Sequence, residues 1–243
     1  MYARKASDSR PELIRLFHKQ NQAKEESKVQ LKLIQTKSSL SAAYELRKGE
    51  QLIARAEIAN NFTYGGSCKV YRGEALEYII SCELGITKAS TRDKKAVKRQ
   101  YKLTDAMGNE YGKIREIRVK TGFLSYYDYT ELSLDGQGEY EMYEIGLGKE
   151  GMKFPIYRGN IQIAQLEKGT VVRNNLDEYD IYAKDEQAAR IGWLLCLYKD
   201  ITEYANRGEI VYKSAEVSYT RTMNKALLSK YDPSFAQRMG KRE

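Results

Sequence analysis

The sequence predicts a β-rich fold of the α+β class: a closed antiparallel β-barrel around a central hydrophobic helix, with helical N- and C-terminal extensions. Three observations lead to this expectation. Three segments share a hairpin-like pattern, further short alternating segments lie between them, and one run of residues is apolar on every side of a helix. Short strands separated by turn signals are typical of barrels and sandwiches.

The hairpin-like segments are residues 44–58, 101–117 and 154–168. In each, an aromatic residue begins a short strand, a turn containing glycine follows, and a return strand ends in a small residue, an apolar residue and a glutamate. Gly-Asn pairs at 108–109 and 159–160 supply the positive φ that tight hairpins need. The small residues are Ala54, Gly112 and Ala164, and the glutamates are Glu57, Glu116 and Glu167.

Other segments complete the expected sheet and the C-terminal region. Residues 178–183, EYDIYA, predict a strand directly before the helix, and residues 209–220 predict one strand after it. Residues 221–229 predict a short basic helix, and residues 232–239 predict a last helix that begins at an Asp-Pro pair. The hairpins recur at irregular intervals, which favours a closed sheet over a solenoid of fixed period. Further strands are expected at 68–71, 76–82, 123–134 and 140–147.

The central helix is expected over residues 185–206. Asp185 is suited to the N-cap, and Glu186 favours the positive end of the helix dipole. Apolar residues occupy every position from Ile191 to Tyr198, and eight residues span about 12 Å of helix. Such a helix must be buried on all sides, and it is far too short to cross a hydrocarbon core of about 30 Å. The expected core residues are Ile191, Trp193, Leu194, Leu195, Leu197 and Tyr198.

These elements divide the chain into three expected regions. Residues 1–40 form a basic, partly helical N-terminal arm, although its stripe Val29–Ile34 is too short to classify. Residues 41–206 form the barrel together with its helix. Residues 207–243 form a strand and a short basic helical tail.

The composition argues against several classes of protein. The three cysteines, Cys68, Cys82 and Cys196, form no CxxC pair, and His18 is the one histidine, so neither a disulfide framework, a metal site nor a cofactor is expected. The first 20 residues lack the apolar core of a signal peptide, and no stretch is long enough to span a bilayer. We therefore expect a cytoplasmic protein, peripheral at the membrane if it binds lipid.

A basic run between the second and third strand pairs is the main candidate binding site. Seven cations stand against the single acid Asp93 within residues 88–102, and the whole chain carries a formal net charge of +8. The cations can bind anionic lipid head groups, at about 1 kcal/mol each near an anionic membrane, or the phosphates of a nucleic acid. The alternative to a binding site is that the basic run forms a solvated helix or loop that joins two strands. The candidate ligands are Lys88, Arg92, Lys94, Lys95, Lys98, Arg99 and Lys102.

Two other groups of residues allow a functional and a structural interpretation. Phe123, Tyr126, Tyr127 and Tyr129, with Lys120 nearby, are able to stack nucleic-acid bases, but alternation favours strand residues shared between core and surface. The acids Asp177, Glu178, Asp180, Asp185 and Glu186 suggest calcium, but they lack the spacing of an EF-hand loop and are better interpreted as charges at hairpin ends.

No recognisable catalytic motif is present. His18 has no serine or cysteine motif beside it, so a nucleophilic triad has little support. The glycine-rich segment 146–151, GLGKEG, lacks the Ser or Thr and the following helix of a Walker loop, so we interpret it as a turn. Trp193 is expected to anchor the core. An enzyme is therefore the less favoured class, although the absence of a motif does not exclude activity.

The order of these elements resembles the tubby C-terminal-like superfamily, with its LURP-one-related and phospholipid-scramblase-like relatives. The resemblance is carried by DAMGNEYGKI (105–114), IYRGNIQIAQLEK (156–168) and the step from DIYA into RIGWLLCLY (180–198), within a best-matching part from Tyr101 to Tyr198. It implies a barrel threaded by a hydrophobic helix and an association with phosphoinositides. The chain departs from the pattern in its basic arm, its basic run and the residues that follow the helix.

Together these observations lead to a first hypothesis of a non-enzymatic binding or scaffold domain. It binds anionic phospholipid at the membrane face or a protein partner. The alternative is a nucleic-acid-associated basic protein that uses the run 88–102 and the tail 221–242.

Overall fold

The structure is a computed structural model that describes residues 28–38, 41–59, 67–82, 95–122, 125–172, 174, 176–204 and 215–241. The strands are β1 (Val29–Ser38), β2 (Ala42–Lys48), β3 (Gln51–Ala59), β4 (Ser67–Arg72), β5 (Ala75–Cys82), β6 (Lys95–Thr104), β7 (Glu110–Lys120), β8 (Tyr126–Leu134), β9 (Gly138–Tyr143), β10 (Ile145–Gly146), β11 (Met152–Arg158), β12 (Ile161–Lys168), β13 (Val171–Val172), β14 (Glu178–Ala183) and β15 (Ala215–Glu216). The helices are α2 (Glu186–Lys199), α3 (Lys225–Leu228) and α4 (Phe235–Arg238), with a 3-10 turn at Gly148–Glu150 and a π-helical turn at Asp200–Tyr204.

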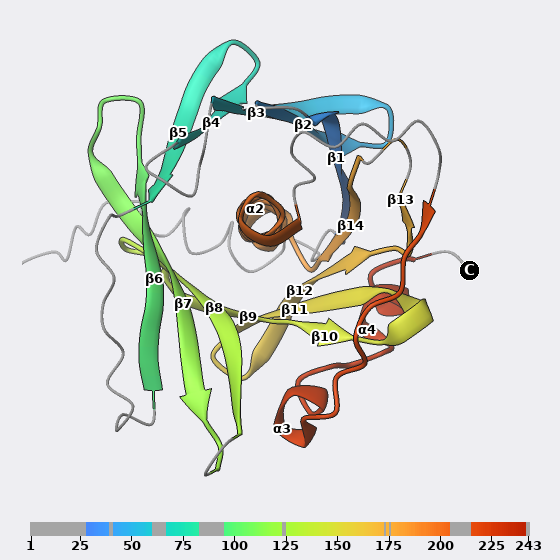
Figure 1. The fold of residues 1–243 in the computed structure, drawn as a ribbon. Helices are drawn as coiled ribbons and strands as arrows, with labels where there is room; N and C mark the ends of the chain where they lie inside the picture. The colour runs from blue at the N-terminus through green and yellow to red at the C-terminus, as the bar shows by residue number, and fades with distance from the viewer. Residues whose placement is uncertain are drawn as a thin grey trace, which may run out of the picture.

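The main sheet closes into an antiparallel barrel (Figure 1). Its 13 strands run in the order β10-β11-β12-β14-β1-β2-β3-β4-β5-β6-β7-β8-β9, and β11 also pairs with β9. This last pairing joins Ile156 to Met142 and Tyr157 to Glu141. The short strand β10 stays at the edge, so 12 strands form the closed wall. Closure removes the exposed sheet edges that promote aggregation.

Helix α2 lies inside the barrel and is seen end-on at its centre in Figure 1. Every residue from Ile191 to Tyr198 is buried, including Trp193 and Leu195, and these residues form one core cluster with inward-facing residues of the strands. The predicted fold class is therefore confirmed, and the six expected core residues are all buried.

Strands on opposite sides of the barrel contact the helix. A side chain at Gly192 would place its Cβ 3.0 Å from Ile181 on β14 and 3.7 Å from Ala164 on β12, so the small residues there allow close approach. Across the barrel, the ring centroid of Trp193 lies 5.9 Å from that of Tyr78 on β5. The helix thus lies against β12 and β14, and large aromatic side chains fill the wider space on the other side.

The three predicted hairpins are β2–β3, β6–β7 and β11–β12. Their turns lie at one end of the barrel together with the start of α2, because adjacent strands alternate in direction. We call this end the mouth and the opposite end, where α2 ends at Lys199, the exit end. Gly49, Gly108 and Gly159 in these turns have positive φ, a conformation that glycine adopts without steric cost.

Two expectations about the chain before the third hairpin are wrong. Residues 29–38 belong to the barrel as β1, between β14 and β2, and not to an N-terminal arm. Their alternating burial identifies a strand, which the short stripe Val29–Ile34 did not distinguish from a helix. Residues 95–104 form strand β6, so the basic run is no helix or loop over this part. Residues 1–27, which contain most of the predicted arm, lie outside the described residues.

The C-terminal tail packs on the outside of the barrel beside β10, β11 and β12 (Figure 1). Leu227 on α3 lies against the outward-facing tyrosines of β8, β9 and β11, and Phe235 and Met239 pack with Tyr182 of β14. The hydroxyl of Tyr157 donates a hydrogen bond of 2.7 Å to the carbonyl oxygen of Lys230. The predicted last helices are present, but the predicted strand 209–220 is reduced to β15 in its described part.

Replacement of a helix residue should show how much the enclosed helix contributes to stability. Leu195→Ala removes a fully buried side chain and is expected to lower the free energy of unfolding by about 2–5 kcal/mol through lost burial and a residual cavity. The matched control is Leu52→Ala, since Leu52 is 44% exposed and a surface change of this kind is expected to cost about 0.5 kcal/mol or less. Urea unfolding of both variants measures the difference, and equal losses would contradict an enclosed helix.

Candidate functional site

The mouth of the barrel contains a cavity of about 510 Å³ beside the first turn of α2. The hairpin β2–β3 contributes Lys48 and Gln51, β4 contributes Arg72, and the turn before β9 contributes Gln137. The helix contributes five lining residues, from Glu186 to Trp193. The volume falls within the range of about 300–1,000 Å³ that is typical of small-molecule sites.

Cations predominate among the charged side chains that line this cavity. Lys48, Arg72 and Arg190 are positive and Glu186 is negative. The ammonium of Lys48 lies 2.8 Å from the carboxylate of Glu186. Arg190 and Arg72 both contact Glu77, at 2.6 and 3.3 Å. Three cations therefore share two carboxylates, and the positive charge that is left over can attract an anionic ligand.

The N-terminus of α2 adds its partial positive charge to the mouth. Asp185 occupies the N-cap, and its carboxylate accepts a hydrogen bond of 2.7 Å from the backbone N–H of Ala188. The cap satisfies one of the free N–H groups of the first turn, and the helix dipole still favours an anion at this end. The predicted N-cap is confirmed. Among the residues that the structure describes, the cavity, the cations and the helix end together make the mouth the site best suited to an anionic group.

The structure places four residues of the predicted basic run on one strand, β6. Lys95 and Lys98 lie nearer the exit end, and Lys102 lies nearer the mouth. The other three predicted ligands, Lys88, Arg92 and Lys94, lie outside the described residues.

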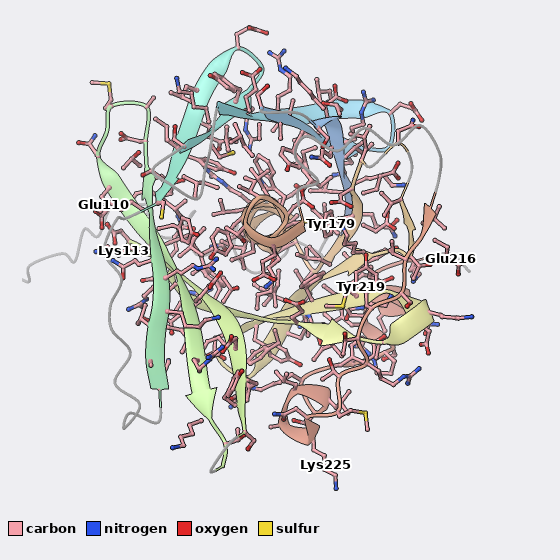
Figure 2. All side chains as sticks on the ribbon, viewed as in Figure 1. Glu110, Lys113, Tyr179, Glu216, Tyr219 and Lys225 are labelled. Carbon is pink, nitrogen blue, oxygen red and sulfur yellow. The ribbon has the colours of Figure 1, made fainter. Side chains whose placement is uncertain are left out.

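Each of these four cations contacts a carboxylate on β7 or β8. The distances are 3.2 Å for Lys95–Glu131, 2.7 Å for Lys98–Asp128, 3.7 Å for Arg99–Glu116 and 3.7 Å for Lys102–Glu110. Figure 2 shows Glu110 with Lys113 on the outer side of the β6–β7 hairpin, where Lys113 contacts the same carboxylate at 3.1 Å. Glu131 and Asp128 likewise contact a second cation each, Arg115 and Arg118. These carboxylates offset part of the positive charge of the described surface, which keeps an excess of cations.

A smaller cleft of about 150 Å³ lies at the exit end and is lined by four carboxylates. Lys199 contacts Glu144 and Glu203, both at 2.6 Å. Burial alone would lower the pKa of Lys199, but these two carboxylates outweigh it and raise the pKa above its ordinary value. Burial, with Glu144 and Glu116 nearby, raises the pKa of Glu203. The cleft holds a network of paired charges and is smaller than a typical small-molecule site.

The cleft also contains a hydrogen bond from the central helix to the barrel wall. The hydroxyl of Tyr198 donates to the carboxylate of Glu116 on β7 at 3.1 Å. Glu116 is almost fully buried, and the side chains of Lys98 and Arg99 lie within 4 Å of it. A buried carboxylate is costly unless cations and donors surround it, so these contacts stabilise one another.

The predicted stacking platform is not a free aromatic surface in its described part. Tyr129 stacks on Tyr143 at 5.4 Å between ring centroids, and the tail covers this cluster through Leu227. Tyr126 is exposed, with the guanidinium of Arg118 only 3.9 Å from its ring centroid. These contacts support the structural interpretation of Tyr126, Tyr127 and Tyr129. Phe123 lies outside the described residues.

The acids once considered for calcium lie apart and have other partners. Glu178 and Asp180 both contact Lys32, at 3.5 and 3.8 Å, whereas Asp177 is buried against Lys168. Within the described residues, no group of three or more His, Cys, Asp or Glu side chains is arranged to hold a metal ion. The segment 146–151 forms an edge strand and a 3-10 turn and makes no phosphate-binding loop. His18 lies outside the described residues.

The sequence analysis did not predict the cationic site at the mouth. Its cations come from positions 48, 72 and 190, which lie on three separate elements and share no motif. The one available signal was indirect, since the strand–helix step at 183–186 places a helix N-terminus at an end of the barrel.

The comparisons with known proteins add no identification. No family model, no curated protein and no solved structure matches this chain. In the part of the chain that the structure describes, no helix has the length and apolar character needed to cross a membrane.

Loss of the buried tyrosine hydroxyl should destabilise the exit end. Tyr198→Phe leaves Glu116 without its hydroxyl donor and is expected to cost about 1–3 kcal/mol of unfolding free energy, because hydrogen bonds to charged groups are the strong ones. Tyr126→Phe is the control, since Tyr126 is 55% exposed. Thermal unfolding of the two variants tests this, and a Tyr198→Phe variant as stable as the control would contradict it.

Proposed function

We propose that the chain is a non-enzymatic binding domain of the tubby-like superfamily, which binds the anionic head group of a phospholipid and so associates peripherally with a membrane. The observation that supports this most directly is the cavity at the mouth, where Lys48, Arg72 and Arg190 surround the N-terminus of α2. A phosphate placed there would meet three cations and the positive end of the helix dipole. A protein partner with an acidic side chain would use the same chemistry.

The architecture is consistent with the superfamily resemblance. A closed barrel around a hydrophobic helix is the arrangement that this resemblance implies, and the helix follows directly after β14, as the step from DIYA into RIGWLLCLY suggested. The phosphoinositide association of that superfamily is the reason to test inositol lipids first.

Nucleic acid is the less favoured ligand. The tyrosines of β8 lie under the tail or beside a guanidinium, and the cations of β6 contact carboxylates. Stacking of bases requires accessible rings. Tyr129 and Tyr143 are buried within their cluster, so the described part of this surface does not offer a row of accessible rings.

Binding to vesicles tests the lipid proposal. We expect the protein to sediment with phosphatidylcholine vesicles that contain a phosphoinositide, and to be released as salt rises. Lys48→Gln combined with Arg190→Gln should weaken this binding by roughly 30-fold, at about 1 kcal/mol for each cation removed near an anionic surface.

A matched double variant separates the mouth from general charge. Lys102→Gln with Lys113→Gln removes the same charge from a pair of lysines that contact Glu110, and it should bind almost as the parent does.

A third variant, Lys88→Gln with Arg92→Gln and Lys94→Gln, tests the rest of the predicted basic run. If the parent shows no salt-sensitive sedimentation, the lipid proposal is wrong. If the two double variants lose equal affinity, the mouth is not the site, and an electrophoretic shift with nucleic acid would favour the alternative class.

A further inference from the structure

A cluster of buried ionisable groups lies at the exit end, away from the mouth. Lys168 is at the end of β12, Asp177 lies just before β14, and Asp200 follows the last turn of α2. All three are buried, with exposed fractions of 4%, 3% and 0%. Buried charges of this kind are costly unless they are paired and hydrogen-bonded.

One ammonium serves both carboxylates. The Nζ atom of Lys168 lies 2.5 Å from Oδ1 of Asp177 and 3.7 Å from Oδ1 of Asp200. The hydroxyl of Tyr179, which Figure 2 labels beside α2, donates to the same Asp200 oxygen at 2.7 Å and accepts from Lys168 at 3.1 Å. If both carboxylates are ionised, the cluster carries one excess negative charge in the interior.

Three polar atoms of the cluster are buried without a hydrogen-bond partner. They are Oδ2 of Asp177, Oδ2 of Asp200 and Nε2 of Gln35. Gln35 belongs to β1 and is fixed to Asp177 by two hydrogen bonds, since its backbone N–H donates to the Asp177 carbonyl at 2.9 Å and its Oε1 accepts from the Asp177 N–H at 3.1 Å. A proton on one carboxylate gives the cluster a donor for an adjacent acceptor and removes the excess charge.

We propose that Asp177, Lys168 and Asp200 form a proton-dependent latch, which holds the end of the central helix to the barrel wall when one proton is shared and loosens it when that proton is lost. The latch joins α2 to β12, to the segment before β14 and, through Gln35, to β1. It is independent of the binding proposed at the mouth.

The tyrosines and the cysteine near Asp177 do not change their charge in the pH range where the latch is expected to respond. Tyr179 and Cys196 are fully buried, and burial raises the pKa of each, so both stay uncharged near neutral pH. The tail contributes Tyr219, whose pKa is also raised by burial. The titratable groups that face Asp177 are Lys168 on β12, Tyr179 on β14, Cys196 on α2, Asp200 after α2 and Tyr219 on the tail.

The direction of the pH dependence follows from the environment of Asp177. Burial, and then the adjacent Asp200 carboxylate, raise the pKa of Asp177 to about 7, although Lys168 opposes the shift. A pKa that is higher in the folded than in the unfolded chain means that the folded state binds the proton more tightly. The contribution to stability is therefore complete below about pH 4, the value of an unfolded aspartate, and is lost as pH rises through about 7.

Replacement of the titrating carboxyl by an amide tests the latch. The background is His18→Gln, which removes the only histidine of the chain, and the variants are Asp177→Asn and, as the matched control, Asp135→Asn in an exposed turn. In the parent and in Asp135→Asn, the melting temperature should fall between pH 6 and 8. In Asp177→Asn this fall should be smaller, and at pH 8 the variant should melt a few degrees above the parent.

A local measurement distinguishes the latch from a general effect of charge. Hydrogen exchange of residues 196–200, corrected for the intrinsic rate, should show lower protection at pH 8 than at pH 6 in the parent and equal protection in Asp177→Asn. Carbon-13 spectra of the parent carboxyl groups provide a test that needs no variant to fold. The proposal is overturned if Asp177→Asn keeps the pH dependence of the parent, or if no aspartate carboxyl of the parent titrates between pH 6 and 8.

Discussion

The rest of the structure depends on the burial of one helix that has no polar face. A helix with apolar residues on every side leaves water only if protein surrounds it completely, and a single packed layer cannot do this. The closed barrel meets the requirement, because 12 antiparallel strands form a wall without edges around α2. The inward-facing residues of nearly every strand then form a single core with Ile191–Tyr198.

The helix is held by packing that differs from side to side. Small residues, Ala164 and Gly192, allow α2 to lie close to β12 and β14, and aromatic rings such as Tyr78 and Tyr101 fill the opposite side. The polar ends of the helix meet the two ends of the barrel. The mouth therefore has the positive end of the helix dipole, and the exit end gathers carboxylates with the lysines Lys168 and Lys199.

This difference between the ends suggests a division of roles. The mouth offers a cavity and cations with few carboxylates, which suits an anionic ligand, whereas the exit end uses its charges to fix the helix in place. The basic run on β6, the most conspicuous charge pattern in the sequence, pairs with acids of β7 and β8 in its described part. The run of like charges in the sequence therefore did not show which carboxylates contact these cations in the folded chain.

The sequence by itself determined the three hairpins, the buried helix and the closed β class, because turn residues, alternation and an all-apolar run act over short distances. It did not identify β1, since the stripe Val29–Ile34 was too short to indicate a period without its neighbours β14 and β2. Only the tertiary structure decided which charges meet. Strand order and barrel closure bring Lys48 near Arg190 at the mouth, and they bring Lys168 near Asp200 at the exit end. These residues lie far apart in the chain, so a local sequence pattern cannot indicate that they meet.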